Sequence, residues 1–263
     1  MSETNTNLKN IIEKGAEIGG SLSGAVIGLA VAGPPGAIVG AIAGPLISSA
    51  FSYVGNEISD KFLSPRESSR IGATYSLAYD NINRKIEEGK TIRDDDFFTS
   101  SDGERSSAET LLEGALLSVR NEYEEKKIKY YANFISNLNF DKSISYEKGN
   151  VLLKIVEQLS YRQLITIAYF RKVGVLDTKN WSISFQNKES LNFYNDFYYE
   201  IMELYNIKLL KENEGISMSV RTLKLSSFGE IMFNLLELDE IEDDDISIIH
   251  QTISEINVLI KNN

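Results

Sequence analysis

The sequence contains no cysteine and only one histidine, His250. The absence of thiols excludes disulfides, cysteine nucleophiles and thiolate zinc sites. The lone histidine falls in an amphipathic segment with Ile249 and Ile253, so we expect it on the surface and not in a catalytic role. The sequence has neither a Ser-His-Asp set nor a phosphate-binding glycine loop. We therefore expect no enzymatic activity, no cofactor and no metal.

Proline is also scarce, and all four prolines lie at or before Pro65. The rest of the chain is therefore free of the strongest helix breaker, and we expect long helices. The run Ser64-Pro65-Arg66-Glu67 is typical of a helix start, and its apolar spacing continues to Gly89. A second start at residues 106–109 predicts one helix through to Leu138, with a bend near Lys126 and Lys127. These helices form a predicted helical body at residues 64–140.

Charge is missing from a long stretch, because no charged side chain lies between Glu17 and Glu57. Small residues recur in this stretch at intervals of four, on either side of a Gly-Pro-Pro-Gly break at residues 33–36. Residues four apart share a helix face, and small side chains there allow two backbones to approach closely. We predict a glycine-zipper helical hairpin at residues 15–56, after a polar N-terminus at 1–14. Its small-residue stripe comprises Gly20, Gly24, Gly28, Gly36, Gly40 and Gly44.

Apolar side chains fill the faces between these glycines and suit either lipid or protein. The expected contact residues are Val26, Leu29, Ile38, Ile42 and Leu46. As helices, residues 18–32 would measure about 22 Å and residues 36–54 about 28 Å, against about 30 Å of bilayer hydrocarbon. A full span would need membrane thinning or oligomerisation. We favour membrane contact; the alternative is a hairpin buried in the protein's own core or in an oligomer seam.

The flanking residues predict where the hairpin lies in the cell. The N-terminus lacks the basic region and the cleavage site of a signal peptide, so we expect the hairpin to remain in the mature protein. Lys9 and Lys14 precede it, and Lys61, Arg66 and Arg70 follow it, while its turn is uncharged. By the positive-inside rule, both ends would stay in the cytosol. We expect a cytoplasmic body that associates with the inner membrane through the hairpin.

Acidic residues outnumber basic ones, giving a net charge of -11, which argues against nonspecific nucleic-acid binding. Seven acids gather at residues 237–245, and we predict an acidic linker and a C-terminal amphipathic helix at 237–263. A polar loop at residues 90–103 holds Asp94, Asp95, Asp96 and Asp102. Consecutive carboxylates repel one another and no histidine is near, so we do not assign a metal site to this loop.

Residues 141–236 predict a winged-helix-like module. The pattern indicates helices at 146–159, 161–172 and 189–204, strands at 207–210 and 217–225, and a helix from Ser227. In DNA-binding modules of this order, a helix reads the major groove. The candidate helix at residues 191–200 has no arginine or lysine, so we expect protein contacts instead of DNA readout.

The end of this module carries a family resemblance. The runs at residues 203–210 and 223–233, the second reading Leu-Lys-Leu-Ser-Ser-Phe-Gly-Glu-Ile-Met-Phe, resemble the closing elements of bacterial abortive-infection proteins of the Abi-alpha type. In that family a short helix and two strands lead into a Leu-Ser/Thr-x-x-Gly-x-x-Phe helix. The resemblance implies phage defence by halting or killing the host cell, with the hairpin as the killing element. It implies no catalytic residues.

Together these patterns predict a mainly α fold with a glycine-zipper hairpin, a long-helix middle region and a winged-helix-like α+β module. We predict a membrane-directed effector, acting in anti-phage abortive infection by membrane insertion or disruption. The alternative is a soluble oligomeric scaffold or adaptor with the hairpin in its assembly seam; a winged-helix transcription regulator ranks third. The expected partners are membrane lipid, another copy of the chain and a protein trigger, and we expect no nucleic acid.

Overall fold

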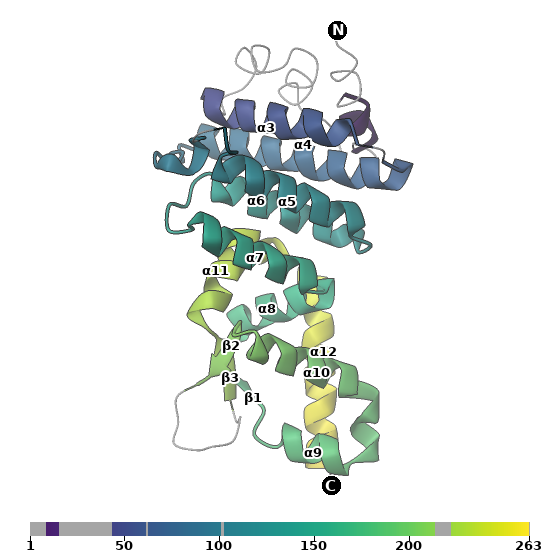
Figure 1. Ribbon diagram of the computed structural model, residues 1–263. Helices are drawn as coiled ribbons and strands as arrows, with labels where there is room; N and C mark the ends of the chain where they lie inside the picture. The colour runs from purple at the N-terminus through teal and green to yellow at the C-terminus, as the bar shows by residue number, and fades with distance from the viewer. Residues whose placement is uncertain (1–8, 16–43, 62, 101–102, 214–221, 263) are drawn as a thin grey trace. The chain divides into compact units, whose positions relative to one another are not determined.

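The computed structural model describes residues 9–15, 44–61, 63–100, 103–213 and 222–262. It divides into two compact units, Met1–Gln158 and Leu159–Asn263. Both units are mainly α-helical, and the second also contains a three-stranded antiparallel sheet (Figure 1). The predicted mainly α fold is therefore confirmed. The division falls later in the chain than residue 141, where we placed the start of the C-terminal module.

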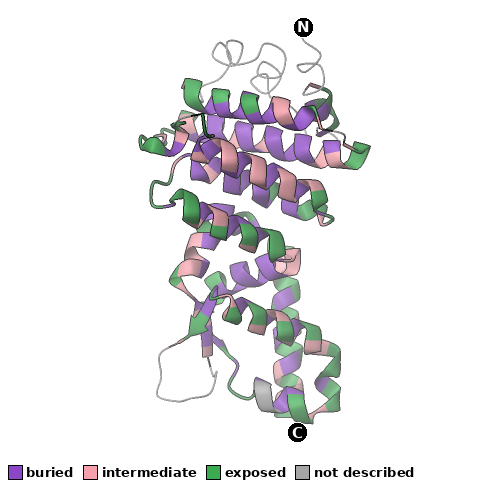
Figure 2. Ribbon diagram, viewed as in Figure 1, coloured by how far each residue is buried: buried purple, intermediate pink, exposed green. Residues whose placement is uncertain are grey.

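The first unit is a stack of helices. A short helix at residues 9–15 precedes the longer ones, which are α3 (Gly44–Ser59), α4 (Pro65–Glu87), α5 (Ser107–Asn121), α6 (Ile128–Leu138) and α7 (Tyr146–Gln158). Within this unit α4 packs on α5 and α6, and α5 also packs on α3 and α7. Residues coloured as buried lie on the faces that these helices turn toward one another (Figure 2). Short 3-10 turns, η1 (Asp96–Phe98) and η2 (Glu125–Lys127), join some of them.

The start of α4 is fixed by the side chains that predicted it. The Ser64 hydroxyl accepts a hydrogen bond from the Glu67 amide, and the Glu67 carboxylate accepts one from the Ser64 amide at 2.7 Å. Arg120 of α5 donates to the other carboxylate oxygen at 2.6 Å. The backbone hydrogen bond from Ser64, and next the Arg120 guanidinium, lower the pKa of Glu67 from 4.5 to about 2. Glu67 therefore joins the cap of α4 to α5.

This lowered pKa predicts acid sensitivity. A carboxylate whose pKa is lower in the folded state stabilises the protein above its unfolded pKa of 4.5, and that contribution is lost as the pH falls through about 2. Glu67→Gln should reduce the free energy of unfolding by about 1 kcal/mol at pH 7, a modest value because the carboxylate is partly exposed. The difference from the wild type should shrink in urea titrations at decreasing pH. The control is Glu87→Gln, in the last turn of α4, and an equal loss in both variants would contradict the prediction.

The middle of the first unit corrects one expectation, because residues 106–138 do not form a single helix. Helix α5 ends at Asn121, Glu122 is extended, and α6 begins only at Ile128. The Glu122 carboxylate accepts the amides of Tyr123 and Glu124 at 2.9 and 3.0 Å and lies 2.5 Å from the Lys127 ammonium. Both charged side chains are buried. A buried ion pair therefore holds the break, close to the predicted bend.

The second unit combines helices with a small sheet. Its elements are α8 (Tyr161–Val173), β1 (Leu176–Asp177), α9 (Trp181–Asn187), η3 (Glu189–Tyr194), α10 (Asn195–Asn206), β2 (Leu210–Glu212), β3 (Thr222–Leu225), α11 (Ser227–Leu236), η4 (Leu238–Glu240) and α12 (Asp243–Lys261). The strand order is β1-β3-β2, and buried leucines pair across it, Leu176 with Leu223 and Leu210 with Leu225. The helix predicted at 189–204 is split into η3 and α10, and β1 and α9 were not predicted.

The serine and glycine of the family-like run have structural roles. The Ser226 hydroxyl accepts the Gly229 amide at 2.9 Å and so caps α11, while the Ser226 amide donates to the Leu209 carbonyl at 3.0 Å. A Cβ on Gly229 would lie 2.2 Å from that same carbonyl oxygen. No larger residue fits at position 229 without moving the backbone at Leu209, just before β2. This part of the resemblance is thus explained by local packing.

The acidic stretch at 237–245 is not simply a linker. It contains η4, and Asp243, Asp244 and Asp245 form the first turn of α12, where negative charge favours a helix. Asp243 pairs with Lys172 at 2.6 Å, and Asp245 accepts a hydrogen bond from the Tyr161 hydroxyl at 2.6 Å. The predicted amphipathic helix follows, and His250 is exposed on it, as expected.

Candidate functional site: the base of the uncharged segment

Helix α3 is the described end of the uncharged segment, and it packs into the core of the first unit. Ile47, Phe51, Val54 and Ile58 recur at helical spacing and are at most 2% exposed. These residues contact neighbouring helices and are not available to lipid. For residues 44–59, the structure therefore has the arrangement of our alternative interpretation, burial in the protein's own core.

Two tyrosines of α4 attach α3 to that core. The Phe51 ring meets the rings of Tyr75 and Tyr79 edge-on, with centroids 5.1 and 5.2 Å apart. The Tyr75 hydroxyl donates to the Phe51 carbonyl at 2.9 Å, and the Tyr79 hydroxyl lies 3.0 Å from the Ser48 hydroxyl. Burial raises the pKa of both tyrosines. Both phenols therefore stay protonated at neutral pH and can donate these hydrogen bonds.

The outer face of α3 has no charge before Glu57. Pro45, Leu46, Ser49 and Tyr53 are exposed there, with Leu46 61% and Tyr53 51% accessible. The helix thus has a buried apolar face and an uncharged outer face. Like residues 18–43 before it, this outer face carries no charged side chain until Glu57.

The other end of the uncharged segment is also attached to α4. In the helix at residues 9–15, Ile11 and Ile12 are buried and Gly15 lies against Gly72 of α4. A Cβ on Gly15 would lie 2.2 Å from the Gly72 carbonyl carbon, and a Cβ on Gly72 would lie 1.9 Å from the Ile11 carbonyl oxygen. The two backbones are therefore in direct contact, which only glycine permits.

We did not predict the contact between Gly15 and Gly72 from the sequence, although a signal for it exists. A glycine inside a helix costs about 1 kcal/mol relative to alanine, so an interior glycine calls for a packing reason. Gly72 lies between the buried residues Ile71 and Ala73 in the middle of α4. That position indicates close approach by another backbone.

The two attachments define the base of the segment at residues 16–43. Gly15, just before this segment, touches α4 at Gly72, and α3, just after it, touches α4 at Tyr75 and Tyr79. Residues 72 and 79 of a helix are separated by about 10 Å along its axis. Both ends of the uncharged segment are therefore held by one helix.

Most of the predicted contact residues lie outside the described residues: Gly20, Gly24, Gly28, Gly36, Gly40, Val26, Leu29, Ile38 and Ile42. Gly44 and Leu46 are described. Gly44 begins α3 with a φ of +73°, so a right-handed helix does not continue through it, and a single helix over residues 36–54 is wrong at this point. Ser48 and Ser52, which continue the small-residue stripe, are buried within the first unit. The described end of the stripe therefore packs inside the protein.

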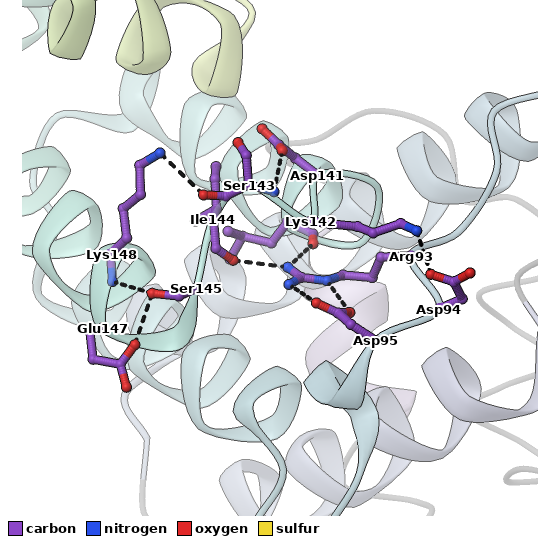
Figure 3. A network of polar contacts seen from close by, with 11 residues as sticks. Arg93, Asp94, Asp95, Asp141, Lys142, Ser143, Ile144, Ser145, Glu147 and Lys148 are labelled. Atoms are coloured by element: carbon purple, nitrogen blue, oxygen red, sulfur yellow. Dashed lines mark hydrogen bonds and ion pairs between the residues drawn. The ribbon is translucent and has the colours of Figure 1, made fainter.

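The loop that holds the predicted aspartate cluster is built around a buried arginine (Figure 3). The Arg93 side chain is 2% exposed and binds both carboxylate oxygens of Asp95, at 2.7 and 2.5 Å. It also donates to the carbonyls of Leu138 and Ile144, each at 3.1 Å, and stacks 4.0 Å from the centre of the Phe97 ring. Arg93 thus fastens this loop to the segment that follows α6.

The neighbouring aspartates have structural partners as well. Asp94 pairs with Lys142 at 2.5 Å, and the hydrogen bond from Lys142 lowers the pKa of Asp94 (Figure 3). The Arg93 guanidinium lowers the pKa of Asp95 in the same way. Among the residues that the structure describes, no group of three or more histidines, aspartates or glutamates could hold a metal ion. Asp94 and Asp95 therefore help to hold this loop against the segment that follows α6.

A search of the described helices finds none that is both long enough and apolar enough to cross a membrane. No protein-family model, curated protein or solved structure matches the chain.

Proposed function

We propose that the protein is a membrane-directed effector whose membrane-contacting segment is residues 16–43, carried by a cytoplasmic body. The observation that supports this most is the attachment of both ends of an uncharged segment to α4. A segment held in this way can enter a membrane from one side while both of its ends stay with the body. The basic residues on both flanks favour the cytosolic side for these ends.

The attachments also limit the depth of insertion. With residues 44–59 committed to the core and the break at residues 33–36, the helical arms available are residues 16–32, about 25 Å, and residues 37–43, about 10 Å, both shorter than the hydrocarbon core of about 30 Å. We therefore propose a shallow hairpin that enters one leaflet or thins the bilayer, and that acts on the membrane as an assembly of several copies. The uncharged outer face of α3 would lie at the membrane surface.

The second unit completes the proposal as a winged-helix-like module that makes protein contacts. The order α8, β1, α9, α10, β2, β3 and the strand order β1-β3-β2 support this assignment. The resemblance to Abi-alpha proteins supports a role in anti-phage abortive infection, and the expected outcome is growth arrest or death of the host cell. A protein bound to this module would restrain or trigger the membrane segment.

A liposome flotation experiment tests the membrane segment. Removing the N-terminal 63 residues is unsuitable because it would also remove the core helix α3, so the test uses substitutions. Val26→Lys with Ile38→Lys should reduce the liposome-bound fraction by more than about tenfold, since each lysine costs up to about 2.5–3.5 kcal/mol at the bilayer centre and two lysines at shallower depth still exceed the roughly 1.4 kcal/mol of a tenfold change. The same variant should relieve growth arrest on expression.

The matched control places a lysine on the exposed surface of the second unit, Ser190→Lys. It should float with liposomes like the wild type. If the Val26→Lys, Ile38→Lys protein still binds liposomes and arrests growth, residues 16–43 are not the membrane segment.

The second candidate function is a soluble oligomeric scaffold with residues 16–43 in the assembly seam. The burial of α3 favours it, because the described part of the segment packs against protein. Here Gly24→Leu with Gly40→Leu should convert the oligomer to a monomer in sedimentation, with unchanged helicity by circular dichroism, because leucine separates closely packed backbones. If the Gly24→Leu, Gly40→Leu variant loses assembly and the wild-type protein does not bind liposomes, the scaffold function is supported. If the variant assembles like the wild type, the segment does not form a glycine zipper. A transcription regulator ranks third, since α10 has no basic residue.

A further inference from the structure

We infer that the outer face of α10, with the η3 turn before it, is a docking surface for an arginine- or lysine-bearing segment of a partner protein. We call this surface the α10 stripe; it consists of Phe193, Asp196, Tyr199 and Glu203. The inference rests on the part of the proposed function that assigns protein contacts to the second unit, and it names the chemistry of the partner.

Two aromatic side chains of the α10 stripe are exposed. Phe193 is 85% accessible, the most of any large hydrophobic side chain among the described residues, and Tyr199 is 68% accessible. Exposed aromatic rings are enriched at protein-binding surfaces, where they supply contact area at a low entropy cost. These two rings are therefore candidates for the energetic centre of an interface.

The rings have a firm support. Tyr199 lies beside Tyr198, with ring centroids 6.1 Å apart, and Tyr198 stacks on Phe185 at 4.5 Å. Phe185 in turn lies 6.1 Å from the buried ring of Trp181. On the other side, Phe193 meets the Tyr194 ring edge-on at 5.3 Å. A surface supported by packed rings loses little conformational freedom when a partner binds.

Carboxylates alternate with the aromatics. Asp196, Tyr199 and Glu203 have the spacing i, i+3, i+7, which places them on one face of α10, and all three are exposed. Helix α10 contains no lysine or arginine. Arg162 lowers the pKa of Asp196 by donating to its carboxylate, so this group stays ionised at neutral pH.

Arg162 and Lys188, two basic side chains of the second unit, are engaged within that unit. Arg162 of α8 binds Asp196 at 2.7 Å and Glu200 at 2.8 Å. Lys188 donates to the carbonyls of Leu259 and Ile260 at the end of α12, at 3.4 and 2.9 Å. Arg162 offsets one of the three negative charges of Asp196, Glu200 and Glu203, and the Glu203 carboxylate accepts a hydrogen bond from the Gln163 side chain at 2.8 Å. The α10 stripe therefore keeps a net negative charge and presents two aromatic faces to solvent.

This chemistry selects a cationic partner. A guanidinium or ammonium group is attracted to the face of an aromatic ring and pairs with carboxylates, and arginine does both best. DNA is disfavoured, because phosphates would meet carboxylates at the position where a groove-reading helix needs bases.

Fluorescence anisotropy with the full chain tests the inference. The probe is a fluorescein-labelled peptide of alanine and arginine, and its matched control replaces each arginine by glutamate. The arginine peptide should bind and the glutamate peptide should not. Phe193→Ala with Tyr199→Ala should weaken binding about tenfold or more, as expected for aromatic anchors. Glu203→Lys should weaken it by a similar factor.

Asp239→Lys is the charge-matched control. Asp239 is exposed in η4, just before the start of α12. The α10 stripe lies at the other end of α12, because η3 packs against α12 and the Tyr194 hydroxyl bonds Glu255 near the end of that helix. This variant should bind the arginine peptide like the wild type. Equal weakening by Asp239→Lys, equal binding of the glutamate peptide, or direct binding of a fluorescein-labelled DNA duplex to the chain would overturn the inference. A dimer that disappears in the Tyr199→Ala variant would overturn it in favour of self-association.

Fluorescence of Trp181, the only tryptophan, reports whether the second unit of each variant stays folded. The two proposals can fail independently. Liposome binding should be unchanged in the α10-stripe variants, and peptide binding should be unchanged in the Val26→Lys, Ile38→Lys variant.

Discussion

Phe51→Ala is expected to lower the free energy of unfolding of the first unit by about 3–5 kcal/mol, the range for a buried phenylalanine. That is a large part of the total stability of a domain, about 5–15 kcal/mol. The ring is 2% exposed and lies between Tyr75 and Tyr79. It also borders a void of about 10 Å³ formed with Phe97 and Leu112, so its removal would enlarge an existing gap.

Tyr53→Ala provides the control, because Tyr53 is on the same helix and 51% exposed. We expect it to change the stability by less than about 1 kcal/mol. Urea unfolding followed by hydrogen exchange in α4 peptides reports on the first unit, while Trp181 fluorescence reports on the second. If Phe51→Ala costs no more than Tyr53→Ala, α3 is not a core helix, and the proposed membrane segment would extend to Ser59.

Lys127→Met should be destabilising by about 3–5 kcal/mol, because it leaves the buried carboxylate of Glu122 without its cation. The carboxylate would keep its two backbone amide donors, but these do not neutralise a full charge in a buried site. The Lys127 ammonium also lies 5.6 Å from the centre of the Tyr131 ring, so a cation–π contact is lost as well. The measurement is the urea midpoint of the first unit.

Two further variants distinguish the ion pair from simple packing. Lys126→Met removes an exposed lysine from the adjacent position and should have little effect. Adding Glu122→Leu to Lys127→Met removes the stranded charge and should recover most of the stability. If the double variant is as unstable as Lys127→Met alone, the shape of the break, and not the ion pair, is what the protein needs.

Local sequence signals predicted the helix starts well. The runs that begin at Ser64 and Ser106 are followed by helices with capping boxes, and α7, α8 and α11 begin where the patterns placed them. These signals succeed because the donor and the acceptor lie only three residues apart. The break at Glu122 was missed because apolar spacing continues across it, while the ion pair that holds it depends on burial by other helices.

The candidate site could be predicted only in part. An uncharged run with small residues at fixed spacing favours close packing, but lipid and protein interiors select the same residue types, so the pattern did not separate α3 from the residues before it. The positive φ of Gly44 separates α3 from the residues before it, and the spacing of residue types along the sequence does not predict a backbone angle of this kind. The contact between Gly15 and Gly72 joins positions far apart in the sequence, and its partner cannot be read from either glycine alone.

The attachment of the uncharged segment to later helices sets an order of events during synthesis. Residues 16–59 leave the ribosome before α4 and α5, the helices that bury α3, have emerged from it. At about 5–20 residues per second, adding residues 60–121 takes on the order of 3–12 seconds. During that interval the inner face of α3 is as open to chaperones and to membrane-insertion machinery as its outer face. Translation speed across α4 and α5 therefore sets how long core burial would compete with the proposed capture at the membrane.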